Sequence, residues 1–421
     1  MEPLIAKVPN CQVAGKAEAV TEVEGKERLL EGIRVLDLSR IIAGPFCSQI
    51  LGDMGAEVIK VEQPGVGDES RTWGPPFQNG ESVYFFCVNR NKKSITVDMK
   101  HPRGKTIIRE LAARSDVLLE NFKPGTLAKL GLDWEDLRQA NPRLIFCSVS
   151  GFGPTGPSAE RGGYDVIVQA VGGLMGITGD PDGPPVKVGV AMTDICTALY
   201  AHGAILAALN ARDRTGEGQR IDVSLLETQI AALINIASSY LNAGETPRKW
   251  GTAHASIVPY QAFKTRDGHM IIGGANDRLW VKLCGAIGLP EVARDPEYAT
   301  NAQRVQHREE IVRLLEARLI TRTRKEWESI LAPLGIPCGP INRMDEVFAD
   351  PQVQHLRMVW ETAHPQVGMI RMVRNPVTFS RTPVDLRDPP PKLGEHTEDV
   401  LRCLLGYSAE EVAELRAAGV V

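Results

Sequence analysis

A single carboxylate, Asp194, stands at the centre of an apolar stretch formed by residues 188–206. Gly and Pro residues just before this stretch predict a turn, and the small apolar residues after Asp194 predict a tightly packed helix. Asp194 is therefore expected where a helix begins. An acid there can serve as an N-cap or first-turn residue that suits the helix dipole. Alternatively, it can be a carboxylate nucleophile that forms covalent acyl intermediates.

Other kinds of catalytic centre find little support in the sequence. It has no Gly-x-Ser-x-Gly segment, which a serine hydrolase would place between a strand and a helix. The eight histidines form no His-Glu-x-x-His motif, and the eight cysteines form no Cys-x-x-Cys pair. A metal site and a disulfide framework are therefore not expected, and the thiols are expected to be reduced. What remains is a metal-free acyl or group transferase with a carboxylate nucleophile.

The N-terminal half alternates between predicted strands and helices. Residues 33–38 and 56–62 predict buried strands, and residues 46–54 between them predict a helix. Such a strand–helix–strand unit implies a parallel sheet, in which ligands bind at the carboxyl ends of the strands. The loops 39–45 and 63–68 are therefore candidate binding loops. Basic residues near loop ends would make a phosphate site if they converge, or a solvated face if they do not: Arg90, Lys92, Lys93, Lys100, Lys123 and Lys129.

Residues 151–156 match the Gly-x-Gly-x-x-Gly pattern of dinucleotide-binding proteins. That motif needs a helix that opens within it, so that the helix N-terminus faces the pyrophosphate. Pro154 and Pro157 argue against such a helix, because proline cannot extend a helix that has already begun. The segment is predicted to be a rigid loop, and a hydride-transfer enzyme is not favoured.

Composition limits the partners of the chain. With 421 residues, a net charge of −4 and a pI near 6.1, it lacks the basic field of a nucleic-acid-binding protein. No apolar run is expected to be long enough to cross a membrane, and glutamates within the first thirty residues fit neither a signal peptide nor a transit peptide. We expect a cytoplasmic protein.

The domain organisation is predicted from changes in pattern along the chain. Residues 1–27 lack apolar periodicity and are expected to be an arm, and residues 226–249 are expected to be a linker built on a long helix that begins at Leu225. The other segments are a large parallel-sheet domain over 28–225, a small α+β domain over 250–345, and a C-terminal segment over 346–421 that returns to the large domain.

From Leu30 to its end the chain resembles the class III coenzyme A transferases, also called the CaiB/BaiF family. Each of the matching segments is weak alone, but their order is specific: 35–40 with 43–45, 55–62, 89–95, 120–125, 150–157 and 391–397. Residues 73–76 and 251–263 are most similar to the branch that acts on glutarate and hydroxymethylglutarate. The resemblance implies an α/β fold with a Rossmann-like large domain, a smaller α+β domain and an interlocked dimer. The expected dimer is a homodimer, although a heteromer with a related subunit is also possible.

The resemblance also implies roles for residues in this chain. Asp194 takes the position of the nucleophile. CoA, a substrate and not a resident cofactor, is expected to contact Ile42, Ala43, Gln63, Val97, Asp98, Lys100, Asn121, Phe122 and Lys129, with Arg161 and Tyr164 nearer the thiol. Many relatives have an arginine where this chain has Gln63. Because a neutral amide lacks a bidentate grip on phosphate, that contact is expected to be weaker or to come from elsewhere.

Three further residues are implied for the acyl end of the site. His254 either touches the distal carboxylate of the acid or is a hydrogen-bonded structural histidine. Gly273 and Gly274 match, in part, a glycine-rich flap that closes over the intermediate. Asp165 and Glu227 either orient their neighbours or are structural acids.

The expected activity is transfer of CoA from a donor such as succinyl-CoA to a dicarboxylic acid such as glutarate or hydroxymethylglutarate. The route is an aspartyl mixed anhydride followed by an aspartyl-CoA thioester. The alternatives are another class III transferase of the malate, benzylsuccinate, formyl/oxalate or carnitine type, an acyl-CoA racemase, and a non-catalytic CoA-binding subunit.

Overall fold

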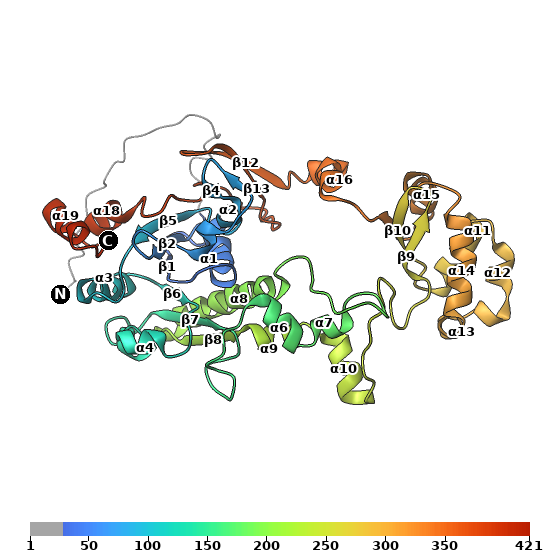
Figure 1. The fold of residues 1–421 in the computed structure, drawn as a ribbon, viewed down its shortest axis with the longest axis horizontal. Coiled ribbons are helices and arrows are strands. Elements are labelled where there is room, and N and C mark those ends of the chain that lie inside the picture. The colour runs from blue at the N-terminus through green and yellow to red at the C-terminus, as the bar shows by residue number, and fades with distance from the viewer. Residues whose placement is uncertain (1–27) are drawn as a thin grey trace. The chain divides into compact units, whose positions relative to one another are not determined.

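The computed structural model describes residues 28–421, so the arm expected over residues 1–27 lies outside the described residues. The chain divides into two compact units (Figure 1). The first unit holds residues 28–172, 189–232 and 357–421, and the second holds residues 173–188 and 233–356. The chain therefore leaves the first unit and returns to it twice.

The first unit is built on a six-stranded parallel sheet, which confirms the predicted α/β class. The strand order is β5-β2-β1-β6-β7-β8. Numbered along the chain, this is the 3-2-1-4-5-6 order of doubly wound dinucleotide-binding folds. The strands are β1 (Arg34–Asp37), β2 (Glu57–Glu62), β5 (Lys92–Thr96), β6 (Val117–Glu120), β7 (Ile145–Ser150) and β8 (Arg220–Ser224).

Alternating strand residues build two cores on opposite faces of the sheet. Val35 packs in one core and Leu36 in the other, as the two-residue period of a strand requires. One face is covered by α3 (Pro102–Ala113), α4 (Thr126–Leu130), α5 (Trp134–Leu137), the π-helix η4 (Val400–Leu404) and α19 (Ala409–Ala417). The other face is covered by α1 (Ala43–Asp53), α6 (Asp165–Val171), α8 (Met192–Thr215) and α9 (Leu225–Ala231).

The remaining elements of the first unit lie along the C-terminal part of the chain and the segment after β2. An antiparallel hairpin of β12 (Val359–His364) and β13 (Gly368–Val373) shares a small core with α2 (Val83–Phe86). The other short elements are η1 (Glu69–Thr72), β3 (Phe77–Gln78), β4 (Glu81–Ser82) and α18 (Thr397–Asp399).

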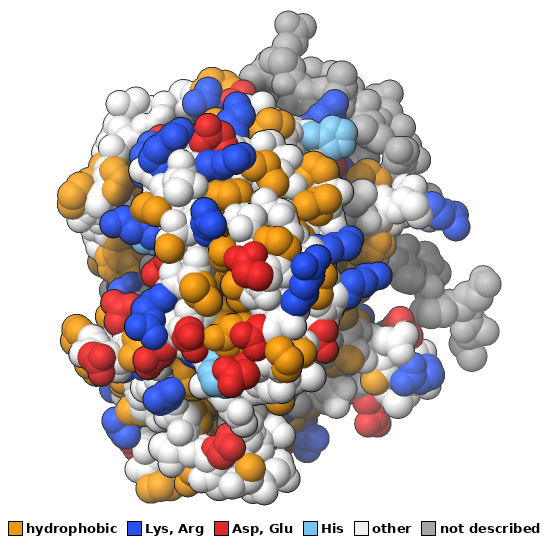
Figure 2. All heavy atoms as spheres, turned by 90° about the vertical axis from the view of Figure 1, so that its right-hand side faces the viewer, with side chains coloured by type: hydrophobic (Ala, Val, Ile, Leu, Met, Phe, Trp, Pro, Cys, Tyr) orange, Lys and Arg blue, Asp and Glu red, His pale blue; other side chains and the backbone are white. Residues whose placement is uncertain are grey.

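The second unit has a three-stranded antiparallel sheet in the order β11-β10-β9. Its strands are β9 (Tyr260–Thr265), β10 (Gly268–Gly273) and β11 (Cys338–Pro340), and β9 and β10 form the hairpin predicted around residues 265–268. Its helices are α7 (Leu174–Ile177), α10 (Ile234–Ala243), α11 (Asp277–Ala286), α12 (Pro290–Arg294), α13 (Asn301–Gln306), α14 (Arg308–Leu319), α15 (Arg324–Leu331), α16 (Met344–Ala349) and α17 (Pro351–His355), with short 3-10 turns η2 (Pro296–Tyr298) and η3 (Ala332–Leu334). On the face in Figure 2, basic side chains are more frequent in the upper part, and acidic side chains lie mostly in the lower part.

Three expectations about helices need correction. The single helix predicted from Leu225 is two helices, α9 and α10, which belong to different units. The break falls at Ile234, whose φ of 38° is incompatible with a continuous helix. The helix predicted over 46–54 begins earlier, at Ala43, because Pro45 is tolerated in a first helical turn.

The third correction concerns α8, which is long and apolar enough to cross a membrane by length and composition, contrary to the expectation for the sequence. In the structure α8 packs against the sheet, with Ala198, Ala201 and Ile205 fully buried in one of the two cores. The apolar residues of α8 thus contribute to a core of the first unit.

Candidate active site

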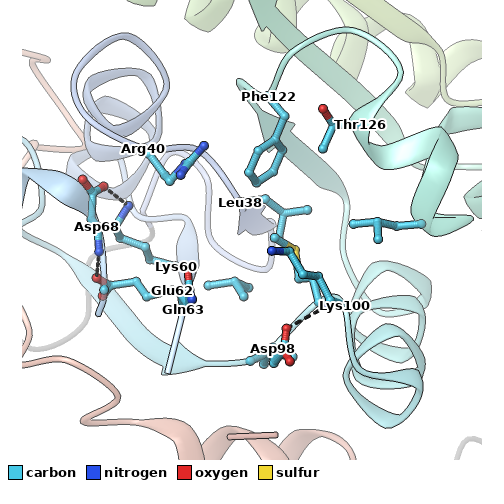
Figure 3. Close-up of a pocket in the computed structure, with 15 residues that line it drawn as sticks. Leu38, Arg40, Lys60, Glu62, Gln63, Asp68, Asp98, Lys100, Phe122 and Thr126 are labelled. Carbon is cyan, nitrogen blue, oxygen red and sulfur yellow. Dashed lines mark hydrogen bonds and ion pairs between the residues drawn. The ribbon is translucent and has the colours of Figure 1, made fainter. Parts of the chain in front are cut away.

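The strand order itself locates the candidate site. The sheet reverses its direction of winding between β1 and β6, and ligands of such sheets bind outside the carboxyl ends of the strands at that point. A cavity of about 290 Å³ lies there, at the ends of β1, β2, β5 and β6 (Figure 3). We call it the outer cavity. All of its lining residues belong to the first unit.

The outer cavity brings together five of the residues predicted to contact CoA. Its lining includes Gln63, Val97, Asp98, Lys100 and Phe122. It also includes an arginine that the sequence analysis did not select, Arg40, whose guanidinium lies 5.0 Å from the centre of the Phe122 ring. In Figure 3, Arg40 and Lys100 come from different loops to the rim of the cavity. Arg40 therefore supplies a guanidinium in the cavity where Gln63 offers only an amide.

A second cavity, of about 330 Å³, adjoins the outer cavity and contains Asp194. We call it the inner cavity. Its lining includes the predicted residues Ile42, Ala43, Asn121, Phe122 and Tyr164, and it shares Arg40 and Phe122 with the outer cavity. The predicted nucleophile and most of the predicted CoA contacts thus line two adjoining cavities of one unit.

Gly151 and Gly163 form part of the inner cavity wall. A Cβ atom on Gly151 would lie 2.5 Å from the Gly163 Cα atom, so the two backbones can approach this closely only without side chains. The segment that contains Gly151 is a loop, as predicted, and the apparent dinucleotide motif at 151–156 serves this backbone contact.

Asp194 lies in the first turn of α8, so the prediction that it sits at a helix start is confirmed. The N-cap position is Ala191, which has no side chain able to cap the helix. The Asp165 carboxylate at the start of α6 does this work, because it accepts hydrogen bonds from the N–H groups of Thr193 at 2.8 Å and Asp194 at 3.4 Å. Because Asp165 caps α8, the Asp194 carboxylate is not needed as a cap. Within residues 28–421 that carboxylate accepts no hydrogen bond.

The electrostatic setting of Asp194 makes its charged form less favourable than that of an ordinary aspartate. Burial, and next the negative charge of Asp165, raise the pKa of Asp194 to about 7. A carboxylate that is poorly solvated and free of hydrogen bonds is a stronger nucleophile than one in water. Its pKa also places the nucleophile at the balance between its protonated and charged forms under neutral conditions.

We expect the rate of Asp194 acylation to rise with pH and to level off above a midpoint near 7, since only the charged carboxylate attacks. Asp165→Asn keeps an oxygen that can cap α8 but removes the neighbouring negative charge. The pKa of Asp194 should then fall, and the midpoint should move to lower pH. Single-turnover reactions with an acyl-CoA donor between about pH 5 and 9 measure this shift. Superimposable profiles for the two proteins would contradict the coupling.

The loop after β1 is held in one conformation by side chains from two other strand ends. Ile41 has a φ of 71°, which is costly for a β-branched residue. Both carboxylate oxygens of Asp68 lie 3.2 Å from the Ile41 nitrogen, and the Asn121 side chain bonds the N–H and the carbonyl of Arg40 at 2.8 Å each. These contacts fix the backbone that leads into Ile42 and Ala43, which line the inner cavity.

A network of buried charged side chains contacts the same loop after β1. The Lys60 ammonium, which is fully buried, donates to the Asp68 carboxylate at 2.8 Å and to the Ser39 carbonyl at 2.9 Å. Asp37, also fully buried, accepts from the Ser48 hydroxyl at 2.5 Å and from the Lys92 ammonium at 3.2 Å. Burial alone would raise the pKa of Asp37, but Lys92, Lys60 and the hydroxyls of Ser39 and Ser48 lower it. Burial likewise opposes the charged form of Asp68, but Lys60 and Ser70 lower its pKa, so both acids are charged.

Several basic residues near predicted loop ends do not face the cavities. Lys92 donates to Asp37, to the Pro45 carbonyl and to Asn89, and burial lowers its pKa to about 8. Arg90 forms a buried ion pair with Asp53 at 2.7 Å. Both are structural residues, so the alternative of a phosphate site at this loop is not supported for them.

The remaining predicted residues lie elsewhere. Lys129 is exposed on α4 and Arg161 stacks on the Phe152 ring at 4.7 Å, and neither lines the two cavities. His254, Gly273 and Gly274 belong to the second unit. The N–H groups of Gly273 and Gly274 donate to the carbonyls of Pro337 and Pro259, so in this conformation neither N–H is available to a ligand.

Arg40, Lys60 and Asp68 were not identified as site residues from the sequence. Arg40 and Asp68 stand in the two loops that the parallel-sheet argument had selected, 39–45 and 63–68, so the signal was present. Lys60 lies inside a predicted strand, and a lysine inside an apolar strand is a sign of a buried ion pair.

Comparison with known proteins identifies the family of the chain. Residues 30–397 match the family described as CoA-transferase family III. A succinyl-CoA:glutarate CoA-transferase of Mus musculus is 49% identical over 93% of this chain and 90% of its own length. A succinate–glutarate CoA-transferase of Agrobacterium fabrum is 44% identical over 91% of this chain and 97% of its own length. The crystal structure of a CaiB/BaiF family protein from Brucella suis has a TM-score of 0.80 at 44% identity, and the match covers 89% of this chain and 99% of that one.

A doubly wound sheet places its ligand site at the switch point, and a desolvated carboxylate beside that point has the chemistry that an acyl or group transferase with a carboxylate nucleophile needs. With these relatives, the chain belongs to CoA-transferase family III and is a CoA-transferase.

Proposed function

We propose that the enzyme moves CoA from succinyl-CoA to glutarate, with Asp194 as the nucleophile. The observation that carries the mechanism is the position of Asp194, half-buried and uncommitted in a cavity that adjoins the switch-point cavity. The substrates are proposed from two relatives, the succinyl-CoA:glutarate CoA-transferase of Mus musculus and the succinate–glutarate CoA-transferase of Agrobacterium fabrum.

The proposed reaction has four steps. The Asp194 carboxylate attacks the thioester carbonyl of succinyl-CoA, and CoA leaves as its thiolate, which gives a mixed anhydride. The thiolate attacks the aspartyl carbonyl and releases succinate, which gives an aspartyl-CoA thioester. The glutarate carboxylate then attacks that thioester and releases the thiolate again. The thiolate finally attacks the glutaryl carbonyl, so that glutaryl-CoA forms and Asp194 is restored.

The residues around Asp194 would serve these steps by position and charge. Arg40 and Lys100 at the outer cavity would hold phosphate groups of CoA as charged donors. The loop from Arg40 to Ala43, held by Asp68 and Asn121, would present its backbone to the developing oxyanion, a kind of contact that usually contributes strongly to catalysis. CoA would act as a substrate, without a resident cofactor.

The test is to incubate the enzyme with succinyl-CoA and glutarate and to measure glutaryl-CoA. Hydroxylamine is added in a parallel reaction with succinyl-CoA, and mass spectrometry of the peptides should locate a hydroxamate at Asp194. Uptake of solvent deuterium at the α-carbon without an adduct would support a racemase instead. If neither product nor adduct forms, the result would support a non-catalytic CoA-binding subunit. Product formation from malate or oxalate alone would support another transferase.

We also propose an interlocked homodimer in the cytoplasm. This assembly follows from the family resemblance and is supported by α10, where Ile234 and Leu241 are 75% and 77% exposed and no residue is buried. An apolar helix that a single chain leaves uncovered is typical of a protein interface. Sedimentation at low protein concentration should give only the dimer, and a stable folded monomer would contradict it.

A further inference from the structure

The turn that follows β6 contributes to both cavities of the first unit. Asn121 lines the inner cavity, and Phe122 lines both cavities. The Asn121 side chain bonds the N–H and the carbonyl of Arg40 at 2.8 Å each, and the Arg40 guanidinium lies 5.0 Å from the centre of the Phe122 ring (Figure 3). The conformation of this turn therefore determines how Arg40 and Phe122 are presented to a ligand.

The side chain of Glu120 holds that turn. Glu120 is the last residue of β6, and its Oε2 atom accepts a hydrogen bond from the Phe122 N–H at 2.7 Å. The carboxylate also accepts from the hydroxyl of Ser148, which stands opposite Glu120 on β7. One carboxylate thus joins the backbone of the turn to the neighbouring strand.

This carboxylate is buried without an ion-pair partner. Glu120 is 5% exposed, and within residues 28–421 it forms no salt bridge. It lines a third cavity of the first unit, of about 170 Å³, which we call the side cavity. Arg220 lines the side cavity too, but it pairs with Asp222 on its own strand at 2.8 Å. The other charged side chains of the lining are Lys123 and Asp133.

The position of Glu120 is unfavourable for its charge. Burial raises the pKa of Glu120 to about 7, although its two hydrogen bonds and the charge of Arg220 act in the opposite direction. Asp222 adds to the rise, and burial keeps the adjacent Cys147 thiol neutral by raising its pKa. Because the unfolded chain releases this proton at lower pH, the charged form lowers the stability of the fold above about pH 7. A buried acid that costs stability without an ion-pair partner is typical of a functional position.

We propose that Glu120 is a positioning residue for CoA, and that its charged carboxylate fixes the turn of Asn121 and Phe122 against Arg40. A charged carboxylate accepts hydrogen bonds that are roughly twice as strong as those to a neutral group. Protonation of Glu120 therefore loosens the turn, and CoA binds more weakly in the protonated protein. This role rests on the proposed function, which puts CoA in the outer cavity.

The test is calorimetric titration of the whole enzyme with CoA between about pH 5.5 and 8.5, in the unaltered protein and in Glu120→Gln. The ratio of the two dissociation constants cancels the titration of CoA itself and of Asp194. It should be close to unity at the acidic end, because both side chains are then neutral. At the basic end Glu120→Gln should bind CoA roughly 5- to 10-fold more weakly, since it keeps an acceptor but not the charge. The midpoint of this change should lie near pH 7.

Two further variants separate position from general damage. Glu120→Asp keeps the charge and can still accept from the N–H two residues later, so it should restore part of the affinity at the basic end. Asp133→Asn removes a charge from the lining of the side cavity but can still cap α5, so its affinity for CoA should equal that of the unaltered enzyme at every pH.

A purely structural role would give other results. In Glu120→Gln, KM for succinyl-CoA should rise with the dissociation constant of CoA, and kcat should change less. Its urea midpoint at the basic end should not fall, because a buried charge has been removed. Equal affinities for CoA at every pH in folded Glu120→Gln and the unaltered enzyme would overturn the proposal. So would a loss of affinity that does not depend on pH and accompanies a lower urea midpoint.

Failure of the proposed function would look different. If CoA binds but no glutaryl-CoA forms, the ratio of dissociation constants still decides the role of Glu120. If the unaltered enzyme binds no CoA, hydrogen exchange of the Phe122 amide in the free protein decides it, because that N–H donates to Glu120. Faster exchange in Glu120→Gln than in Asp133→Asn above about pH 7 supports a positioning role. Equal exchange in the two variants overturns it.

Discussion

Replacement of Asp194 by alanine should lower the rate of CoA transfer roughly 10⁴-fold or more, which is the scale of loss when a covalent nucleophile is removed. The two connected cavities and the loop from Arg40 to Ala43 remain in this variant, so binding of CoA should survive. The rate of glutaryl-CoA formation measures the first effect. Calorimetric titration with CoA measures the second.

Asp213→Ala is the matched control, because Asp213 is an exposed acid near the other end of the same helix, α8. Its activity and its far-ultraviolet circular dichroism should equal those of the unaltered enzyme. A folded Asp194→Ala protein that transfers CoA at the normal rate would show that another group carries the acyl chain. The proposed mechanism would then be wrong, even though the chain remains a CoA-transferase.

Much of the first unit could be predicted from the sequence because its signals are local. Apolar strands that alternate with helices predict a parallel sheet, and the sheet then places the loops after β1 and β2 at one edge. The approximate positions of Asp194, Ile42, Ala43, Gln63 and Phe122 follow from that argument and from the family resemblance. The candidate site residues that stand just after strand ends could therefore be predicted.

What could not be predicted depends on contacts between residues distant in the sequence. Lys92 lies in a basic segment that is typical of a solvated or phosphate-binding loop, yet it pairs with Asp37, which stands 55 positions earlier. The capping of α8 by Asp165 joins residues 28 positions apart, and no local pattern distinguishes that acid from a surface one. The break between α9 and α10 likewise lacks a Gly or Pro signal.

The second large effect concerns stability and follows from the buried network under the loop after β1. Lys60→Met removes the ammonium that lies between the charged carboxylates of Asp37 and Asp68, and it leaves Asp68 without its buried ion-pair partner. Removal of one partner of a buried ion pair typically lowers the free energy of unfolding by about 3–5 kcal/mol. Denaturation by urea, monitored by circular dichroism, should show a loss of this size.

The same substitution should also change catalysis in the protein that remains folded. Asp68 holds the N–H of Ile41 in its left-handed conformation, and protonation of an unpaired Asp68 would weaken that hold. The loop into Ile42 and Ala43 would then relax, and KM for the acyl-CoA donor should rise together with a fall in kcat.

Lys93→Met is the matched control, because Lys93 lies on β5 with a half-exposed side chain that pairs with Glu57 at the surface. A surface pair contributes at most about 1 kcal/mol, so Lys93→Met should lose little stability and leave both kinetic constants unchanged. Equal losses in the two variants would mean that the network under the loop has no special role.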